Sequence, residues 1–191
     1  CVISGGFTEI EEISERMDSL GVACRRLRTS HAFHSSMMDP MLGAFAEQVR
    51  KANPQPPNIP FVSNVTGTWI SPSEATDANY WTDHPRNTVR FEQGLRTVME
   101  QPESVLLEVG PGRTLSTFAM RHADRPEQQA VVSSLAGAKD GSGDDVAILE
   151  SLGNIWMAGI QPDWSGFHSD EKRCRVSLPG YPFQRERHWI E

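Results

Sequence analysis

Two histidines stand three residues apart in the segment His31-Ala32-Phe33-His34. An imidazole has an unperturbed pKa of about 6.5, so it accepts and returns a proton near neutral pH. Either ring is therefore a candidate general base for a neighbouring hydroxyl. Histidines in a polar loop without a catalytic role fit the same spacing, and that alternative stays open. A metal site is disfavoured, since H-x-x-x-H is the usual zinc spacing on one helix face and no cysteine or carboxylate pair stands nearby.

A serine nucleophile to accompany such a base is not evident. No G-x-S-x-G sequence occurs, so the chain lacks the nucleophile elbow of α/β hydrolases. Ser35 and Ser36 follow His34 directly, but adjacency does not provide the strained turn that exposes a nucleophile. If His34 is a catalytic base, we expect its serine to lie outside this chain.

Three further features are weaker candidates for a site. Gly110-Pro111-Gly112 follows an apolar run, but it lacks both the third glycine of G-x-G-x-x-G and the Lys-Ser/Thr of a P-loop, so a tight strand-to-helix turn is favoured. Ser63 and Asn64 end another apolar run, where they could present polar groups to a site, although asparagine is also a common turn residue. The remaining histidines are isolated in the sequence and are interpreted as surface or core residues: His84, His122, His168 and His188.

The elements that must position these residues alternate between apolar runs and amphipathic stretches. The patterns predict strands over residues 1–4, 22–28, 59–63 and 105–109. They predict helices over residues 8–20, 38–51, 114–121 and 146–157, with helical pieces at 80–81 and 89–99. Short strands alternating with helices favour a mostly parallel α/β core.

Composition narrows the class of protein. The chain has 191 residues, of which 38% are hydrophobic, and 18 Lys and Arg against 25 Asp and Glu give a net charge of −7. An acidic chain without a basic cluster has no electrostatic footprint for nucleic acid or for anionic membranes. Its apolar runs are far below the roughly 18 residues of a membrane span. Three dispersed cysteines without a secretory signal indicate a reducing cytoplasm. The chain also opens at Cys1 inside a predicted strand, so we expect a fragment.

Taken in order, the motifs resemble the C-terminal part of the acyltransferase domain of type I modular polyketide synthases, followed by the post-acyltransferase linker. The segments that carry this resemblance are 21–27 (GVACRRL), 30–35 (SHAFHS) with Met38 and Pro40, 62–67 (VSNVTG), 80–81 (YW), 89–91 (VRF) and 108–112 (EVGPG). Residues 178–189 (LPGYPFQRERHW) resemble the end of the linker. The resemblance covers essentially the whole chain.

The resemblance implies an α/β fold in three parts. Residues 1–30 would complete the second half of a ferredoxin-like small subdomain, residues 31–135 would form the C-terminal part of an α/β hydrolase-like core, and residues 136–191 would form the linker, as a helix and an extended tail. In such synthases the tail packs back along the acyltransferase. That packing would bury four aromatic residues: Trp164, Tyr181, Phe183 and Trp189.

The resemblance also implies a chemistry. A serine attacks the thioester of malonyl-CoA, a histidine takes its proton, and the acyl group then passes to the phosphopantetheine thiol of an acyl carrier protein. By its place in the motif, that base corresponds to His34. A main-chain carbonyl orients the base in this family, and we expect it at Ser63–Asn64.

His31, Ala32 and Phe33 correspond to the family's selectivity motif. The H-A-F-H form accompanies malonyl units, whereas Y-A-S-H accompanies methylmalonyl units. Phe33 would fill the space that a serine leaves for an α-methyl group. Because one methyl group in an apolar pocket is worth only about 1–3 kcal/mol, the motif biases the selection without deciding it alone.

The implied partners are malonyl-CoA, the acyl carrier protein, the adjacent ketosynthase and the downstream domains of a cytoplasmic synthase. No cofactor is assigned to this chain, because the phosphopantetheine belongs to the carrier protein. The serine, the oxyanion-hole glutamine and the arginine that pairs with the malonyl carboxylate should all precede Cys1, so the fragment alone should be inactive. The alternative is a non-catalytic scaffold or docking fragment in which His34 is vestigial.

Overall fold

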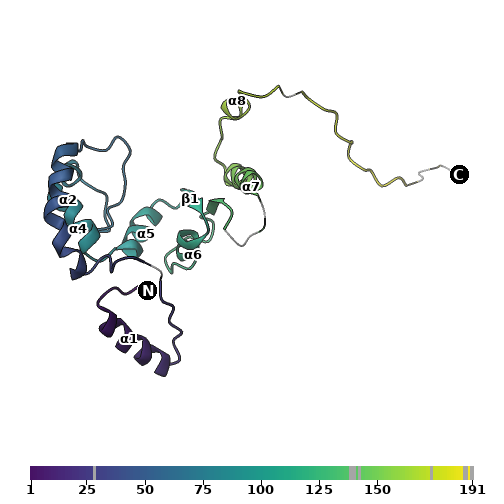
Figure 1. The fold of residues 1–191 in the computed structure, drawn as a ribbon. Helices are drawn as coiled ribbons and strands as arrows, with labels where there is room; N and C mark the ends of the chain where they lie inside the picture. The colour runs from purple at the N-terminus through teal and green to yellow at the C-terminus, as the bar shows by residue number, and fades with distance from the viewer. Residues whose placement is uncertain (28, 138–140, 142, 173, 187–188, 190–191) are drawn as a thin grey trace.

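The computed structural model describes residues 1–27, 29–137, 141, 143–172, 174–186 and 189 (Figure 1). In chain order the elements are α1 (Phe7–Ser19), η1 (Ser36–Met38), α2 (Asp39–Ala52), α3 (Pro72–Thr76), α4 (Ala78–Arg86), α5 (Phe91–Met99), β1 (Leu106–Pro111), α6 (Thr114–Met120), β2 (Val131–Leu135), α7 (Asp144–Met157) and α8 (Trp164–Phe167). The helices predicted over 38–51, 114–121 and 146–157 are confirmed within one or two residues. No helix in the described part of the chain is long and apolar enough to cross a membrane.

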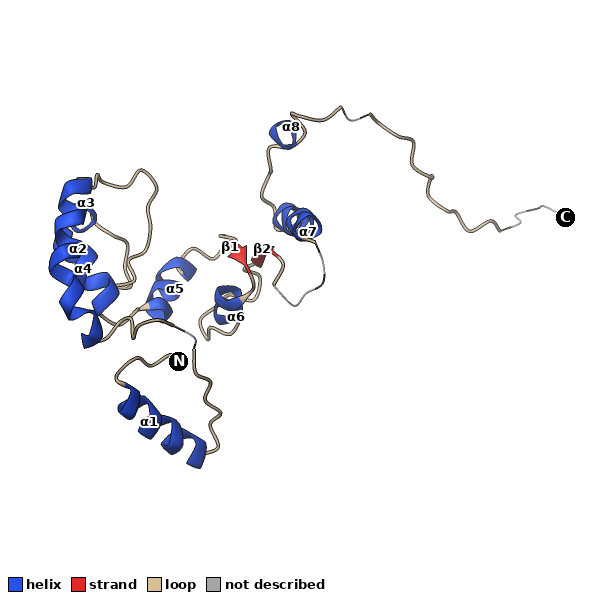
Figure 2. Ribbon diagram, viewed as in Figure 1, coloured by secondary structure: helices blue, strands red, loops and turns tan. Residues whose placement is uncertain are grey.

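A β-α-β unit forms one of two packed regions. β1 and β2 pair in parallel, with Leu106 opposite Val131, and α6 connects them. Figure 2 shows α6 and α7 on opposite sides of the two strands, and both helices contact β2. This pair confirms the parallel α/β prediction, although the strand over 131–135 was not predicted. Several of the buried residues gather here: Met99, Ser116, Ala119, Gln129, Val132 and Ala136.

The second packed region is formed by α2, α3 and α4. α2 packs against α4, which also contacts α3 and η1. Small side chains allow these helices to approach closely. The buried residues of this region are Met38, Ala46, Ser63, Ala75, Ala78 and Tyr80.

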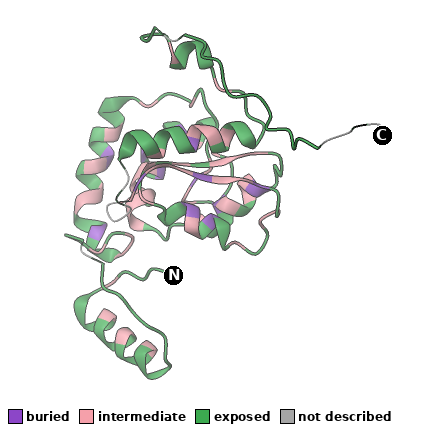
Figure 3. Cartoon of the chain, turned by 90° about the vertical axis from the view of Figure 1, so that its right-hand side faces the viewer, coloured by how far each residue is buried: buried purple, intermediate pink, exposed green. Residues whose placement is uncertain are grey.

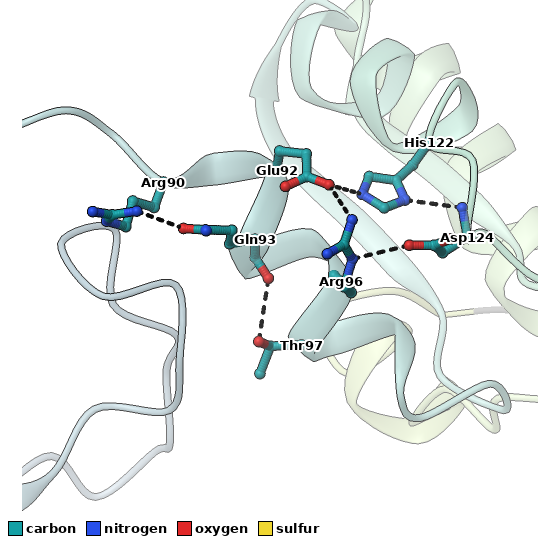
Figure 4. A network of polar contacts seen from close by, with 7 residues as sticks. All are labelled: Arg90, Glu92, Gln93, Arg96, Thr97, His122 and Asp124. Carbon is teal, nitrogen blue, oxygen red and sulfur yellow. Dashed lines mark hydrogen bonds and ion pairs between the residues drawn. The ribbon is translucent and has the colours of Figure 1, made fainter.

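α5 connects the two regions through polar contacts. Arg96 bridges Glu92, at 2.7 Å, and Asp124, at 2.9 Å, in the loop after α6 (Figure 4). The nearly buried His122 places Nε2 3.4 Å from the same Glu92 carboxylate. Individual exposed ion pairs contribute only about 0–1 kcal/mol, but these three form one network between α5 and the β-α-β unit.

Residues at both ends of α5 also hold the turn over 63–67. The Thr97 hydroxyl donates to the carbonyl of Gly67 at 2.6 Å, and the Arg90 N–H donates to the carbonyl of Asn64 at 2.8 Å. α5 therefore fixes that turn with respect to the strands.

The predicted strands over 1–4 and 22–28 are wrong for the residues described; residue 28 lies outside them. Both segments are irregular and flank α1, which has no buried residue (Figure 3). A strand is stable only when a neighbour satisfies its N–H and C=O groups, and these segments have no such partner among the described residues. The predicted strand over 59–63 is reduced to one antiparallel bridge, Val62 with Trp69, because Pro60 has no N–H to donate.

The aromatic residues of the C-terminal tail are not buried as predicted. Trp164, Tyr181, Phe183 and Trp189 are 39%, 76%, 78% and 76% exposed. Beyond α8 the tail extends away from the helices and strands (Figure 1). Trp164 contacts Trp156 edge-on, with 6.2 Å between the ring centroids, whereas Tyr181 and Phe183 contact each other. An aromatic side chain is buried only where a facing surface exists, and the described residues offer none to the tail beyond α8.

Candidate active site around His34

His34 lies in a strained turn immediately before η1. Its φ of 62° is in the left-handed region, which costs a non-glycine residue on the order of 1–3 kcal/mol unless its surroundings hold it there. The main chain of α4 supplies that support, because the His34 N–H donates to the carbonyl of Pro85 at 2.8 Å. Strain of this kind is concentrated at functional sites, where it fixes the direction of a side chain.

The ring of His34 is oriented by a second carbonyl of the same segment. Nδ1 of His34 lies 2.9 Å from the carbonyl oxygen of Asn87. A carbonyl only accepts, so Nδ1 carries the proton of the neutral ring and Nε2 keeps its lone pair. The geometry thereby leaves Nε2 as the atom able to take a proton from a substrate or a nucleophile.

These two carbonyls are available because α4 ends beside them. α4 ends at Arg86 and its C-cap is Asn87, whose N–H closes the last turn on Asp83 at 2.8 Å. The last carbonyls of a helix have no intrahelical donor. Pro85 and Asn87 can therefore both accept hydrogen bonds from His34.

The prediction that Ser63–Asn64 supplies the orienting carbonyl is corrected: the acceptor is Asn87. Ser63 is fully buried, and its Oγ accepts hydrogen bonds from the N–H groups of Val65 and Thr66 and from the hydroxyl of Tyr80. The carbonyl of Asn64 accepts instead from Arg90, three residues after Asn87. Ser63 and Asn64 thus support the segment that orients His34.

His84 is isolated in the sequence, but in the structure it lies beside His34. Its ring lies edge-on to the ring of His34, with centroids 6.4 Å apart and an angle of 62° between the planes. Burial lowers the pKa of His84 below 6.5, and a charge on His34 lowers it further. Both causes favour the neutral form of the His84 ring. No local pattern signals this pairing, because the two residues belong to segments far apart in the chain.

The segment His31-Ala32-Phe33 has an internal scaffold. The hydroxyl of Ser35 donates to the carbonyl of Ala32 at 2.5 Å, and the N–H of Ala32 points at the sulfur of Met37 at 3.3 Å. Phe33 is 45% exposed beside the base, with its ring 6.3 Å from that of His31. The apolar side chain of Phe33 is thus exposed at the residue that precedes His34.

The turn Gly110-Pro111-Gly112 positions a carboxylate of the chain itself. The oxygens of Glu108 accept hydrogen bonds from the N–H groups of Leu115, at 3.1 Å, and Ser116, at 2.7 Å, in the first turn of α6. Burial by itself would raise the pKa of Glu108, but these hydrogen bonds outweigh it and the pKa is lowered. The position where a phosphate would bind is occupied by Glu108, which agrees with a tight structural turn.

Comparison with known proteins places this geometry in a family. A family model described as the acyl transferase domain matches residues 1–162. A phenolphthiocerol/phthiocerol polyketide synthase of Mycobacterium tuberculosis is 38% identical over 191 residues, which is 100% of this chain and 13% of that protein.

Solved structures agree with the sequence comparison. The acyl transferase domain of ZmaA matches with a TM-score of 0.79 and 32% identity, over 92% of this chain and 40% of that one. The acyltransferase domain from the second module of the salinomycin polyketide synthase matches with a TM-score of 0.78 and 35% identity, over 94% and 41%. The chain belongs to the acyl transferase domain family, in the form found in type I polyketide synthases. It spans less than half of these solved domains and about an eighth of the mycobacterial synthase.

Proposed function

We propose that this chain supplies the general base and part of the acyl pocket of a transferase that moves a malonyl extender unit from coenzyme A to the phosphopantetheine thiol of an acyl carrier protein. The observation that carries the proposal is the contact between His34 Nδ1 and the Asn87 carbonyl, which leaves Nε2 of His34 as a proton acceptor. In this proposal the nucleophilic serine belongs to the part of the domain that precedes this chain.

The first half-reaction loads the serine. The serine oxygen attacks the thioester carbonyl, a C–O bond forms, and His34 Nε2 takes the hydroxyl proton. The tetrahedral intermediate then collapses, the C–S bond breaks, and the imidazolium returns its proton to the departing thiolate of coenzyme A. The Asn87 carbonyl remains hydrogen-bonded to Nδ1 throughout, so it compensates part of the positive charge that the ring acquires.

The second half-reaction runs the same proton path in reverse. The thiol of the carrier arm gives its proton to His34 Nε2 and its sulfur attacks the acyl-serine ester. The C–O bond breaks and the serine oxygen takes the proton back. One base therefore serves both steps, which requires the ring to stay in one tautomer.

Selectivity for the malonyl unit is assigned to His31, Ala32 and Phe33. The support is the exposed aromatic ring of Phe33, the residue before His34, because a ring at this position would fill space that an α-methyl group needs.

We also infer that residues 1–30 form the second half of a ferredoxin-like subdomain in the complete domain. The support is the apolar surface that α1 and its flanks leave uncovered, with Phe7 at 68%, Leu20 at 66% and Val22 at 51% exposure. Covering such residues is a main source of folding free energy.

The test measures acyl transfer by the full-length protein from malonyl-CoA and methylmalonyl-CoA to a carrier protein, with and without His34→Ala. We expect malonyl transfer that falls by a factor of about 10³ or more in the variant, the magnitude typical for removing a base that activates a nucleophile. His168→Ala, in which the replaced histidine lies beside α8, is the matched control. Full transfer without His34 would overturn the mechanism. An inactive parent protein would favour the non-catalytic scaffold.

A further inference from the structure

Three successive residues at the end of α4 contact either His34 or the start of α2. The carbonyl of Pro85 accepts from the His34 main chain, and the carbonyl of Asn87 accepts from the His34 ring. Between them, Nε of Arg86 forms an ion pair and hydrogen bond with Oδ1 of Asp39. We call the Asp39–Arg86 pair the clasp. It is the side-chain link between the first residue of α2 and the last residue of α4.

The clasp lies beside two residues that stand outside regular helix geometry. His34 has a left-handed backbone, and Asn87 has already left the helix, with an extended conformation of φ −90° and ψ 165°. The orienting carbonyl is thus carried by a residue that no longer belongs to a regular element. The clasp joins the residue before Asn87 to α2, a helix of 14 residues that begins five residues after His34.

The geometry of arginine suits this role. Its guanidinium is planar and donates in fixed directions, so the pair fixes an orientation as well as a separation. The carboxylate of Asp39 also lies in the first turn of α2, where the helix dipole favours a negative charge.

We infer that Asp39 and Arg86 are positioning residues that hold the Asn87 carbonyl in register with Nδ1 of His34. The inference rests on the proposed function, in which His34 is the base. Neither charged group is hydrogen-bonded to the ring of His34, so their effect passes through the main chain of residues 85–87.

A role in stability alone predicts something different. The side chains of Arg86 and Asp39 are 35% and 52% exposed, and exposed ion pairs contribute little to folding because water and salt screen them. Breaking the clasp should therefore leave the unfolding temperature nearly unchanged while it displaces the carbonyl. A displacement of about 1 Å is enough to slow a positioned reaction severalfold or more.

The experiment uses the full-length protein and measures single-turnover loading from malonyl-CoA. Asp39→Asn and Arg86→Gln should each lower the loading rate by about tenfold with little change in KM, since substrate binding is not disturbed. Arg86→Lys keeps the charge and should recover part of the rate. Glu47→Gln, which removes a carboxylate from an exposed position of the same helix, should have no effect.

Two double variants distinguish a positioning role from a general loss of structure. Asp39→Asn combined with Arg86→Gln should be no slower than either single variant, because the two residues act as one pair. Asp39→Asn should have no further effect on the residual rate of His34→Ala, because its path to the reaction is through that ring.

Unchanged loading rates in both clasp variants, or a further loss in the His34→Ala background, would overturn the inference. A fall in the unfolding temperature that accounts for the lost rate would do the same. Failure of the proposed function is seen separately, as activity that survives in His34→Ala.

Discussion

Nδ1 of His34 and the carbonyl oxygen of Asn87 lie 2.9 Å apart although 53 residues separate them in the chain. The contact selects one tautomer of the imidazole, because the acceptor carries no proton of its own. It also explains why a carboxylate partner is unnecessary for orientation: the free carbonyls at the end of α4 serve the same purpose.

Replacing Phe33 by Ser should relax the discrimination between extender units. Removing the ring leaves room for an α-methyl group, and a pocket change of that size alters relative specificity by about 1–3 kcal/mol, or roughly 10–200-fold. The measurement is the ratio of kcat/KM for malonyl-CoA and methylmalonyl-CoA in the full-length protein. A ratio equal to that of the parent would show that Phe33 does not face the acyl group.

Replacing Ser63 by Ala should destabilise the turn over 63–67. Its Oγ accepts from two N–H groups and one hydroxyl in a fully buried position, and the variant leaves those donors unsatisfied at a cost of about 2–3 kcal/mol. Tyr80→Phe removes only one of the donors and should cost about 1 kcal/mol. The free energy of unfolding of both variants is to be measured by denaturant unfolding. Equal losses of stability in the two variants would contradict this account.

His84 should make the protein less stable in mild acid. Because its pKa in the folded state is lowered from 6.5, the unfolded chain binds this proton first as the pH falls. The stability that a neutral His84 contributes is therefore complete above that value and is lost progressively below it. In His84→Asn, the drop in unfolding temperature between about pH 7.5 and about pH 5.5 should be smaller than in the parent. Parallel curves over the whole range would show that His84 titrates alike in both states.

The contribution of Glu108 to folding stability should also be lost in acid, but at a lower pH than the contribution of His84. Its pKa is lowered from 4.5, so its carboxylate contributes stability above that value and loses the contribution as the pH falls through the lowered pKa. At neutral pH, Glu108→Gln should cost about 1–2 kcal/mol, because the amide replaces a charged acceptor of the α6 N–H groups. The difference from the parent should shrink in acid. Glu103→Gln, at an exposed position nearby, is the control and should leave the unfolding curve unchanged.

Much of the fold was predictable because its causes are local. The helical spacing of Met38, Met41, Leu42, Phe45 and Val49 predicts α2, and the apolar run before Gly110 predicts β1. The strands predicted on either side of α1 are not formed, because a strand needs a neighbouring strand to bond to and a run of apolar residues does not provide one. The predicted burial of the aromatic tail was wrong for a similar reason. Apolar side chains favour burial, but they do not specify the surface against which they are buried.

The sequence by itself determined which residue is the candidate base: the two-histidine segment and its place in an ordered set of motifs point to His34. Only the tertiary structure decided how that base is held. Its orienting acceptor is a main-chain carbonyl, which has no signature in residue types, and the partners His84, Asn87 and Arg86 come from a segment about fifty residues away. The packing of α2 against α4 brings these groups together, and local periodicity carries no information about such long-range contacts.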